Sequence, residues 1–193
     1  MRAGDVITAI EVGTTKICTI VEKKVNGRLP EVVDHSVVPC AGLKKGNVED
    51  INLTSEAIRE SLKRVREKTD VPVTNAYVGI TGSHVGFDNK TDSFDSVGGM
   101  GVITSEEVDR IPDLVSVGSA AVGREVLHAL PKTYRVDGHN GITDPTGMHA
   151  SGIEVTSHVV TVGSSFVRDL ETAVISAGPV SYTPLTLTTK ASG

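Results

Sequence analysis

The chain has 193 residues and a formal net charge of −5, and 38% of its residues are hydrophobic. The length suits one ordinary domain or two small ones, and the negative charge gives no electrostatic reason to expect nucleic acid. No apolar run is long enough to cross a bilayer, and no signal-peptide pattern opens the chain. The two cysteines, Cys18 and Cys40, match neither a disulfide framework nor a zinc spacing, so we expect reduced thiols in a cytoplasmic protein.

The stretch Val6–Lys16 predicts a strand followed by a tight turn. Its first half is β-branched and apolar enough for a buried strand, and the carboxylate of Glu11 lies near the end of that strand. Ile17–Val21 predicts a second strand, so the turn joins two strands rather than a strand and a helix.

The turn itself combines a flexible position with polar side chains. It supplies one glycine, two hydroxyls and one ammonium, from Gly13, Thr14, Thr15 and Lys16. The glycine permits a positive φ, and converging backbone N–H groups with a lysine beside them can bind phosphate. The carboxylate at the strand end could hold Mg²⁺ through water. An ordinary hairpin turn with a solvated lysine explains the same residues equally well, because short Gly-Thr motifs occur by chance.

The next segments predict a small mixed sheet. Asn26-Gly27 predicts a hairpin between Ile17–Val25 and Leu29–Val38, so three antiparallel strands open the chain. Residues 42–51 follow as a loop. Ala76–Ile80 predicts a further strand after a helix, which is the opening of a mixed α/β sheet of RNase H or actin type.

The helix before that strand is expected to begin with Asn52 as its cap and to run to about Lys68. Apolar residues recur at helical spacing, which predicts a face packed on a sheet. Two ion pairs are expected on the outer face, Glu60 with Arg64 and Lys63 with Glu67.

From Gly82 the sequence becomes polar, and Gly82–Phe87 is expected to lead into an Asp- and Ser-rich loop. Thr104–Glu107 is a capping box that begins a helix. Pro112 is expected to kink or shorten that helix.

Two further strands are predicted at Glu125–Val136 and Gly152–Val162, joined by a long turn-rich connection over Asp137–Met148. Residues 84–163 are therefore predicted to form a strand, a helix and two further strands in that order, which suits an inserted subdomain. Ser164 or Ser165 is expected to cap the last helix.

Catalytic and metal-binding motifs are not recognisable. The six histidines form no i,i+4 pair and have no cysteine partner, so we expect no metal ligands among them. No Ser/His/Asp arrangement stands out, and we assign no catalytic residue.

Several motifs, in order along the chain, resemble the FtsA family of bacterial cell-division proteins. The stretch Ile7–Lys16 is similar to the first phosphate motif of the actin, Hsp70 and sugar-kinase superfamily. More specific matches to FtsA are the following segments: Gly42–Ile51, Tyr77–His84, Arg124–Gly138, Gly141–Pro145 and Gly147-Met148.

This resemblance implies an α/β fold class, a partial actin-like (RNase H-type) mixed sheet with an inserted strand-helix-strand-strand (SHS2) subdomain. Residues 1–83 correspond to the first part of actin-like subdomain 1A, 84–163 to the inserted SHS2 subdomain (1C), and 164–178 to the return helix of subdomain 1A. Residues 179–193 match nothing in the family and resemble translated adapter sequence, so they are expected to be a non-native tail without packed contacts.

The resemblance also implies a function. FtsA-like proteins bind ATP with Mg²⁺, self-associate, link FtsZ filaments to the cytoplasmic face of the inner membrane and recruit later divisome proteins to the septum. The phosphate-binding residues carried over are Glu11, Gly13, Thr14, Thr15 and Lys16, and the partner-binding residues are Asp137, His139, Asn140 and Asp144. The second half of the family's fold, with its FtsZ-binding and membrane-binding regions, has no counterpart in this sequence, so we expect a truncated nucleotide cleft and weak ATPase activity at most.

Two departures and two alternatives accompany the resemblance. Glu11 stands where the family carries aspartate, and Pro112 lies in a helix that the family leaves continuous. An enzyme of the sugar-kinase branch or a pilus-assembly adaptor (PilM-like) would share the same actin-like body. The motifs Leu127–Gly138 and Gly141–Pro145 favour FtsA over both.

Overall fold

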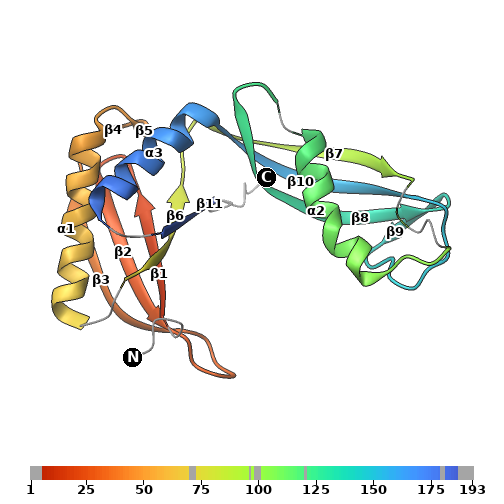
Figure 1. The fold of residues 1–193 in the computed structure, drawn as a ribbon, viewed down its shortest axis with the longest axis horizontal. Helices are drawn as coiled ribbons and strands as arrows, with labels where there is room; N and C mark the ends of the chain where they lie inside the picture. Colours follow the sequence, from red (N-terminus) through yellow and green to blue (C-terminus); the bar gives the residue numbers. More distant parts are fainter. Residues whose placement is uncertain are drawn as a thin grey trace. The chain divides into compact units, whose positions relative to one another are not determined.

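The computed structural model describes residues 6–69, 73–95, 97, 101–119, 121–178 and 181–186. By internal contacts the chain divides into two compact units, one made of the residues up to Val85 together with those from Gly163 onward, and the other made of Gly86–Val162. Each unit has its own sheet, which is accompanied by α1 and α3 in the first unit and by α2 in the second (Figure 1).

The first unit is built on a five-stranded mixed sheet with the order β11-β6-β1-β2-β3. Its strands are β1 (Val6–Val12), β2 (Lys16–Lys23), β3 (Glu31–Pro39), β6 (Asn75–Ile80) and β11 (Ser181–Thr186). The opening meander is antiparallel, whereas β6 runs parallel to both β1 and β11. With the second unit described below, this confirms the predicted fold class.

Two helices, α1 (Ile51–Thr69) and α3 (Ser164–Ala177), bury their apolar stripes in this unit. The ends of both helices differ from the prediction. Leu53 N–H donates to Asp50 Oδ1 at 2.9 Å, so Asp50 caps α1 in place of Asn52. Gly163 occupies the cap position of α3 without a side-chain hydrogen bond, so neither predicted serine caps it.

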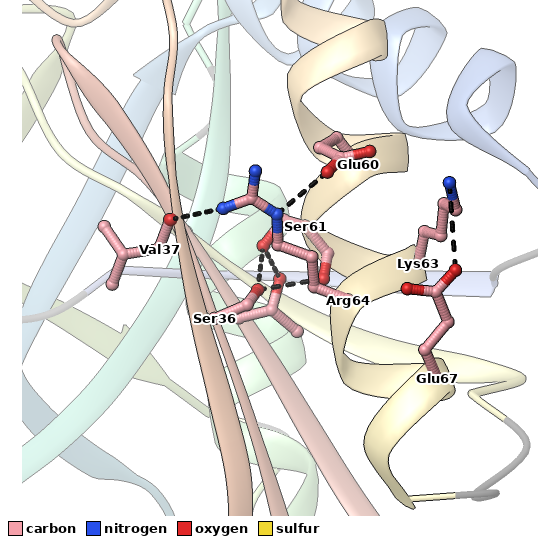
Figure 2. A network of polar contacts seen from close by, with 8 residues as sticks. Ser36, Val37, Glu60, Ser61, Lys63, Arg64 and Glu67 are labelled. Atoms are coloured by element: carbon pink, nitrogen blue, oxygen red, sulfur yellow. Dashed lines mark hydrogen bonds and ion pairs between the residues drawn. The ribbon is translucent and has the colours of Figure 1, made fainter.

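The exposed face of α1 carries both predicted ion pairs. Arg64 Nε lies 2.8 Å from Glu60 Oε1, and Lys63 Nζ lies 3.7 Å from Glu67 Oε1. Arg64 also donates to the carbonyl of Val37 on β3 at 3.4 Å, which joins the helix to the sheet edge (Figure 2).

Three buried hydroxyls join α1 to the sheet. Ser36 donates to the Ser61 carbonyl at 2.8 Å, and the two serine hydroxyls lie 2.6 Å apart (Figure 2). Because each hydroxyl has one hydrogen, Ser61 must donate to Ser36, and Thr19 must donate to Ser61 across 2.8 Å. Every hydroxyl hydrogen in this buried chain is therefore used.

The predicted loop over residues 42–51 contains a short hairpin, β4 (Leu43–Lys44) and β5 (Asn47–Val48). Lys45 and Gly46 both have positive φ at its turn, as a two-residue turn of this type requires. A Cβ on Gly46 would lie 2.7 Å from the carbonyl oxygen of Thr81. Two segments that carry the family resemblance, residues 42–51 and 77–84, therefore pack against each other.

The second unit is a four-stranded sheet with the order β7-β10-β8-β9 and one helix. Its elements are β7 (Val85–Phe94), α2 (Ser105–Ser119), β8 (Arg124–Val136), β9 (His139–Ile142) and β10 (Ile153–Gly163). Ile111 and Val115 of α2 pack with Tyr134, Val155 and Val159 in one core. The two long strands predicted from the sequence, β8 and β10, pair with each other.

Two predictions in this unit are wrong, and a third is wrong in part. The strand predicted to open residues 84–163 is present as β7, but its ten residues include the polar stretch that we expected to be a loop. An edge strand tolerates such polar side chains. The connection after Asp137 contains β9: Asp137 and Gly138 both have positive φ and close a hairpin with β8. Helix α2 continues to Ser119 through Pro112, so the predicted shortening is wrong, and the predicted kink stays a prediction.

The tail differs from the prediction as well. Ser181–Thr186 form β11, which pairs in parallel with Asn75–Ile80 of β6. The expected absence of packed contacts is therefore wrong for these residues, because the open edge of β6 offers backbone groups to any extended segment. Residues 179, 180 and 187–193 lie outside the described residues.

Candidate nucleotide-phosphate site

The predicted phosphate-binding residues lie where two parallel strands, β1 and β6, end side by side. Ala9, Ile10 and Glu11 pair with Tyr77, Val78 and Gly79, so the turn after Val12 and the residue Thr81 follow at the same edge of the sheet. The carboxyl ends of parallel strands are where open α/β sheets bind ligands.

The turn after β1 is a tight hairpin. Gly13 N–H donates to the Lys16 carbonyl at 3.1 Å, and Cys40 N–H donates to the Thr15 carbonyl at 2.9 Å, which fastens the turn beside the end of β3. Gly13 permits a positive φ but does not adopt one. A Cβ on Gly13 would lie 3.2 Å from the Lys16 carbonyl oxygen, so the glycine allows the two backbone segments of the turn to approach closely. Thr14, Thr15 and Lys16 are exposed.

Glu11 lies on the sheet face opposite α1. Its neighbour Ile10 pairs with Thr19, which belongs to the buried hydroxyl chain under α1, and successive side chains of a strand point to opposite faces. Glu11 is half-buried, and Thr81 Oγ1 donates to its Oε1 at 3.5 Å. Burial raises the pKa of the Glu11 carboxyl, and the hydrogen bond from Thr81 lowers it in part.

The end of β1 and the turn after it carry the kinds of group that a phosphate–magnesium ligand needs. The turn offers two exposed hydroxyls and one ammonium, and Glu11 adds a carboxylate near the end of β1, the strand that leads into the turn. Hydroxyl and ammonium donors suit phosphate oxygens, and carboxylate oxygens suit Mg²⁺. The donor set therefore fits ATP with Mg²⁺, although the Gly13 N–H is engaged with Lys16 and is not among the available donors.

The second group of predicted residues lies in the other unit, along the hairpin β8–β9 and the turn after it. Asp137, His139, Asn140 and Asp144 are all exposed. Asp144 Oδ1 accepts from Thr146 N–H at 2.9 Å. Hydrogen bonding to the Thr146 side chain, together with this bond to its backbone N–H, lowers the pKa of the Asp144 carboxyl. The structure thus places these side chains on an ordered hairpin and turn.

One of the four, Asp137, borders a polar hollow of about 240 Å³. Arg135 and Glu154, which form an ion pair, also line the hollow. The other three predicted partner residues are not among its lining residues.

Within the described ranges, no group of three His, Cys, Asp or Glu side chains is placed to hold a metal ion. In the same part of the chain, no helix is both long and apolar enough to cross a membrane.

Sequence reasoning missed Gly79 and Thr81 as members of the site. Both belong to Tyr77–His84, which was singled out only as a mark of the family. The parallel pairing of β1 with β6 places them beside Glu11. Helix α1 leads to β6 from β3 and not from β1, so the local sequence does not show which strand β6 will pair with.

The second unit coincides with a known domain. The family described as "SHS2 domain inserted in FTSA" matches residues 82–161. The chain carries the SHS2 domain of the FtsA family. The resemblance to FtsA predicted from the motifs is thereby confirmed, and the FtsA-type domain accounts for β7, α2, β8, β9 and most of β10.

Similarity to FtsA extends over both units. The chain is 28% identical to the cell-division protein FtsA of Pseudomonas aeruginosa over 183 residues, covering 92% of this chain and 42% of that protein. It is 26% identical to FtsA of Bacillus subtilis over 178 residues, covering 92% of this chain and 40% of that protein. The chain thus spans about two fifths of the length of these FtsA relatives.

A solved structure shares the fold. The PilM–PilN type IV pilus biogenesis complex includes a chain that aligns with a TM-score of 0.60 at 14% identity, covering 94% of this chain and 47% of that one. At this identity the likeness shows the fold alone.

Proposed function

We propose that this chain is the N-terminal part of an FtsA-like cell-division protein that acts as an adaptor. The observation that carries the proposal is the FtsA-type SHS2 domain at residues 82–161, inserted after a mixed sheet whose strand ends fit a phosphate ligand. The proposed role in the cell cycle is to link FtsZ filaments to the membrane at the septum and to recruit divisome proteins on its cytoplasmic side.

In this proposal the predicted subdomains keep their assignments. Residues 1–83 and the helix at 164–178 form part of actin-like subdomain 1A, and residues 84–163 form subdomain 1C. The assignment to subdomain 1A is supported by the compact first unit, in which the strands β6-β1-β2-β3 form one sheet and α1 and α3 belong to the same unit.

The turn Gly13–Lys16 would hold the phosphates of ATP through Lys16 and the two threonine hydroxyls. Bound Mg²⁺ would neutralise phosphate charge, and Glu11 would face it from the end of β1. We assign no general base, and hydrolysis by this site is expected to be weak at most. The role assigned to ATP is therefore to order the protein for binding.

The hairpin β8–β9 and its following turn would supply a partner surface. Four polar side chains, those of Asp137, His139, Asn140 and Asp144, are exposed on a backbone held by the β-ladder and by the Asp144 turn. An ordered polar edge suits self-association and the recruitment of later division proteins. Binding of FtsZ is assigned to other parts of the full-length family fold.

A pilus-assembly adaptor is the second candidate, because the PilM–PilN chain has the same fold over 94% of this chain. The sugar-kinase alternative rests on the shared actin-like body alone. The FtsA-specific domain match favours cell division over both.

A domain exchange tests the proposal. Residues 82–161 would replace the matching segment of P. aeruginosa FtsA, and the chimera would be expressed in cells depleted of their own FtsA. We expect septation to be restored and the chimera to gather at midcell. Growth of the cells as undivided filaments, with a chimera that is folded and present at normal levels, would contradict the proposal.

A matched control identifies the surface involved. In the same chimera, His139–Thr146 would be replaced by a Gly-Ser linker of equal length. We expect this variant to reach midcell and to fail in the recruitment of later division proteins. Full septation by this variant would remove the hairpin from the proposed role.

A further inference from the structure

Glu11 and Gly79 are directly paired across the parallel strands β1 and β6. A Cβ built on Gly79 would lie 2.2 Å from Glu11 Oε2 and 3.3 Å from its carboxyl carbon. Real Cβ atoms essentially never come as close to another atom as this one would to Oε2, so the Glu11 carboxylate, as placed, occupies the volume that any other residue at position 79 would need for its side chain.

The second carboxylate oxygen is directed to the end of β6. Thr81 Oγ1 donates to Glu11 Oε1 at 3.5 Å, two residues beyond Gly79 on the same strand face. The carboxylate therefore lies over Gly79 of β6 and accepts a hydrogen bond from Thr81, which follows the last residue of that strand.

We propose that Gly79 and Thr81 are positioning residues that hold the Glu11 carboxylate at the strand ends, and that Glu11 and Gly79 form a matched pair. The inference rests on the proposed ATP site, to which it adds the side chains that orient the acidic group. Aspartate would end about 1.5 Å nearer the backbone of β1 and would withdraw from the space above Gly79. The pair thus accounts for how the longer glutamate side chain is accommodated at the end of β1.

A cycle of variants of the 193-residue chain tests the pair. Gly79→Ala should force the Glu11 carboxylate away, and we expect its melting temperature to fall by about 2–4 °C, as for mild overpacking. In the Glu11→Asp background the same Gly79→Ala change should cost less than half as much. Equal losses in both backgrounds would overturn the pairing.

A matched glycine controls for the general effect of an added methyl group. A Cβ on Gly118 of α2 would meet no atom within 4 Å, and its φ is not positive. Gly118→Ala should therefore leave the melting temperature unchanged or raise it, since alanine favours a helix. A fall equal to that of Gly79→Ala would show that the loss at position 79 has nothing to do with Glu11.

The role of Thr81 needs a readout other than stability. The ¹³C shift of the Glu11 carboxyl, measured by NMR at constant pH, should change in Thr81→Val and stay near the original value in Thr81→Ser, which keeps the hydroxyl. Identical shifts in all three proteins would overturn the positioning role of Thr81.

Titration with Mg²⁺–ATP separates this inference from the proposed function. If the Glu11 and Gly79 variants show coupling and Gly79→Ala also weakens Mg²⁺–ATP binding several-fold, the Glu11–Gly79 pair and the proposed ATP site are both supported. Coupling without any change in binding would support the pair and contradict the use of Glu11 in an ATP site.

Discussion

Ser61 of α1 and Ser36 of β3 place their hydroxyl oxygens 2.6 Å apart inside the interface between the helix and the sheet. Both residues are almost completely buried, as is Thr19, which donates to Ser61. The interface is therefore held by a directed chain of hydroxyls, which fixes where α1 lies along the sheet more tightly than apolar contacts alone would.

Removing the central hydroxyl should be costly. Ser61→Ala leaves the Thr19 hydroxyl and one acceptor of Ser36 without partners in a dry interface, and we expect a loss of about 1–3 kcal/mol in the free energy of unfolding. Urea denaturation measures it. Ser165→Ala, at an exposed position of α3, is the control and should change stability by less than about 0.5 kcal/mol. A similar small change for Ser61→Ala would contradict the directed chain.

The start of α2 makes a second prediction. Thr104 Oγ1 accepts from Glu107 N–H at 3.2 Å, and Glu107 Oε2 accepts from Thr104 N–H at 2.8 Å. Thr104→Ala should therefore destabilise the chain by about 1 kcal/mol. Glu107→Ala should weaken the box, because it removes the acceptor of the Thr104 N–H, whereas Glu106→Ala removes a neighbouring exposed side chain outside the box. Equal effects of the two alanine substitutions, measured by thermal unfolding, would show that the box does not stabilise the helix.

The raised pKa of Glu11 predicts a pH dependence of stability. In the window between the unfolded-state pKa and the raised folded-state pKa, the folded chain binds more protons than the unfolded chain. Stability from this group is therefore present at low pH and is lost as the pH rises through the folded-state pKa. Glu11→Gln should remove that decline and should be at least as stable as the original chain at pH 7. Urea unfolding at several pH values measures both proteins.

Glu56→Gln, at an exposed position of α1, is the control for the loss of one carboxylate. Its pH profile should follow that of the original chain. A Glu11→Gln profile that also follows the original chain would show that burial of Glu11 has no consequence for stability.

Local patterns predicted most of the elements and their chemistry. The turn after β1, the apolar stripe of α1 and the capping box of α2 each depend on residues close together in sequence, and the structure contains all three. The helix caps were harder to predict, because Asp50 and Asn52 both have side chains suited to the position, and only the path of the chain before the helix selects Asp50.

Features that depend on distant partners were missed. The middle of strand β7 is polar, so the local sequence does not indicate a strand there. Its pairing with β10, which includes a contact of 3.0 Å between the hydroxyls of Thr91 and Thr156, stabilises the extended conformation. Asp-Gly is a recognisable hairpin signal, but Asp137-Gly138 was predicted to be part of a longer loop. Two long strands, a short hairpin and helix α1 lie between Glu11 and Gly79 in the sequence. The close approach of these two residues could therefore be recognised only once the pairing of β1 with β6 was known.

The central claim about the site is that the ends of β1 and β6 bind the phosphates of Mg²⁺–ATP. The most direct test is an NMR titration of the isotopically labelled 193-residue chain with Mg²⁺–ATP. Because Thr14, Thr15 and Lys16 are exposed, attraction between solvated charges is only about 1 kcal/mol at contact. We therefore expect saturable shifts with a Kd of about 1 mM, concentrated at Gly13–Lys16 and Thr81, and reduced by Lys16→Ala. Shifts confined to residues 86–162, no saturable shift, or micromolar binding that Lys16→Ala leaves unchanged would contradict this account.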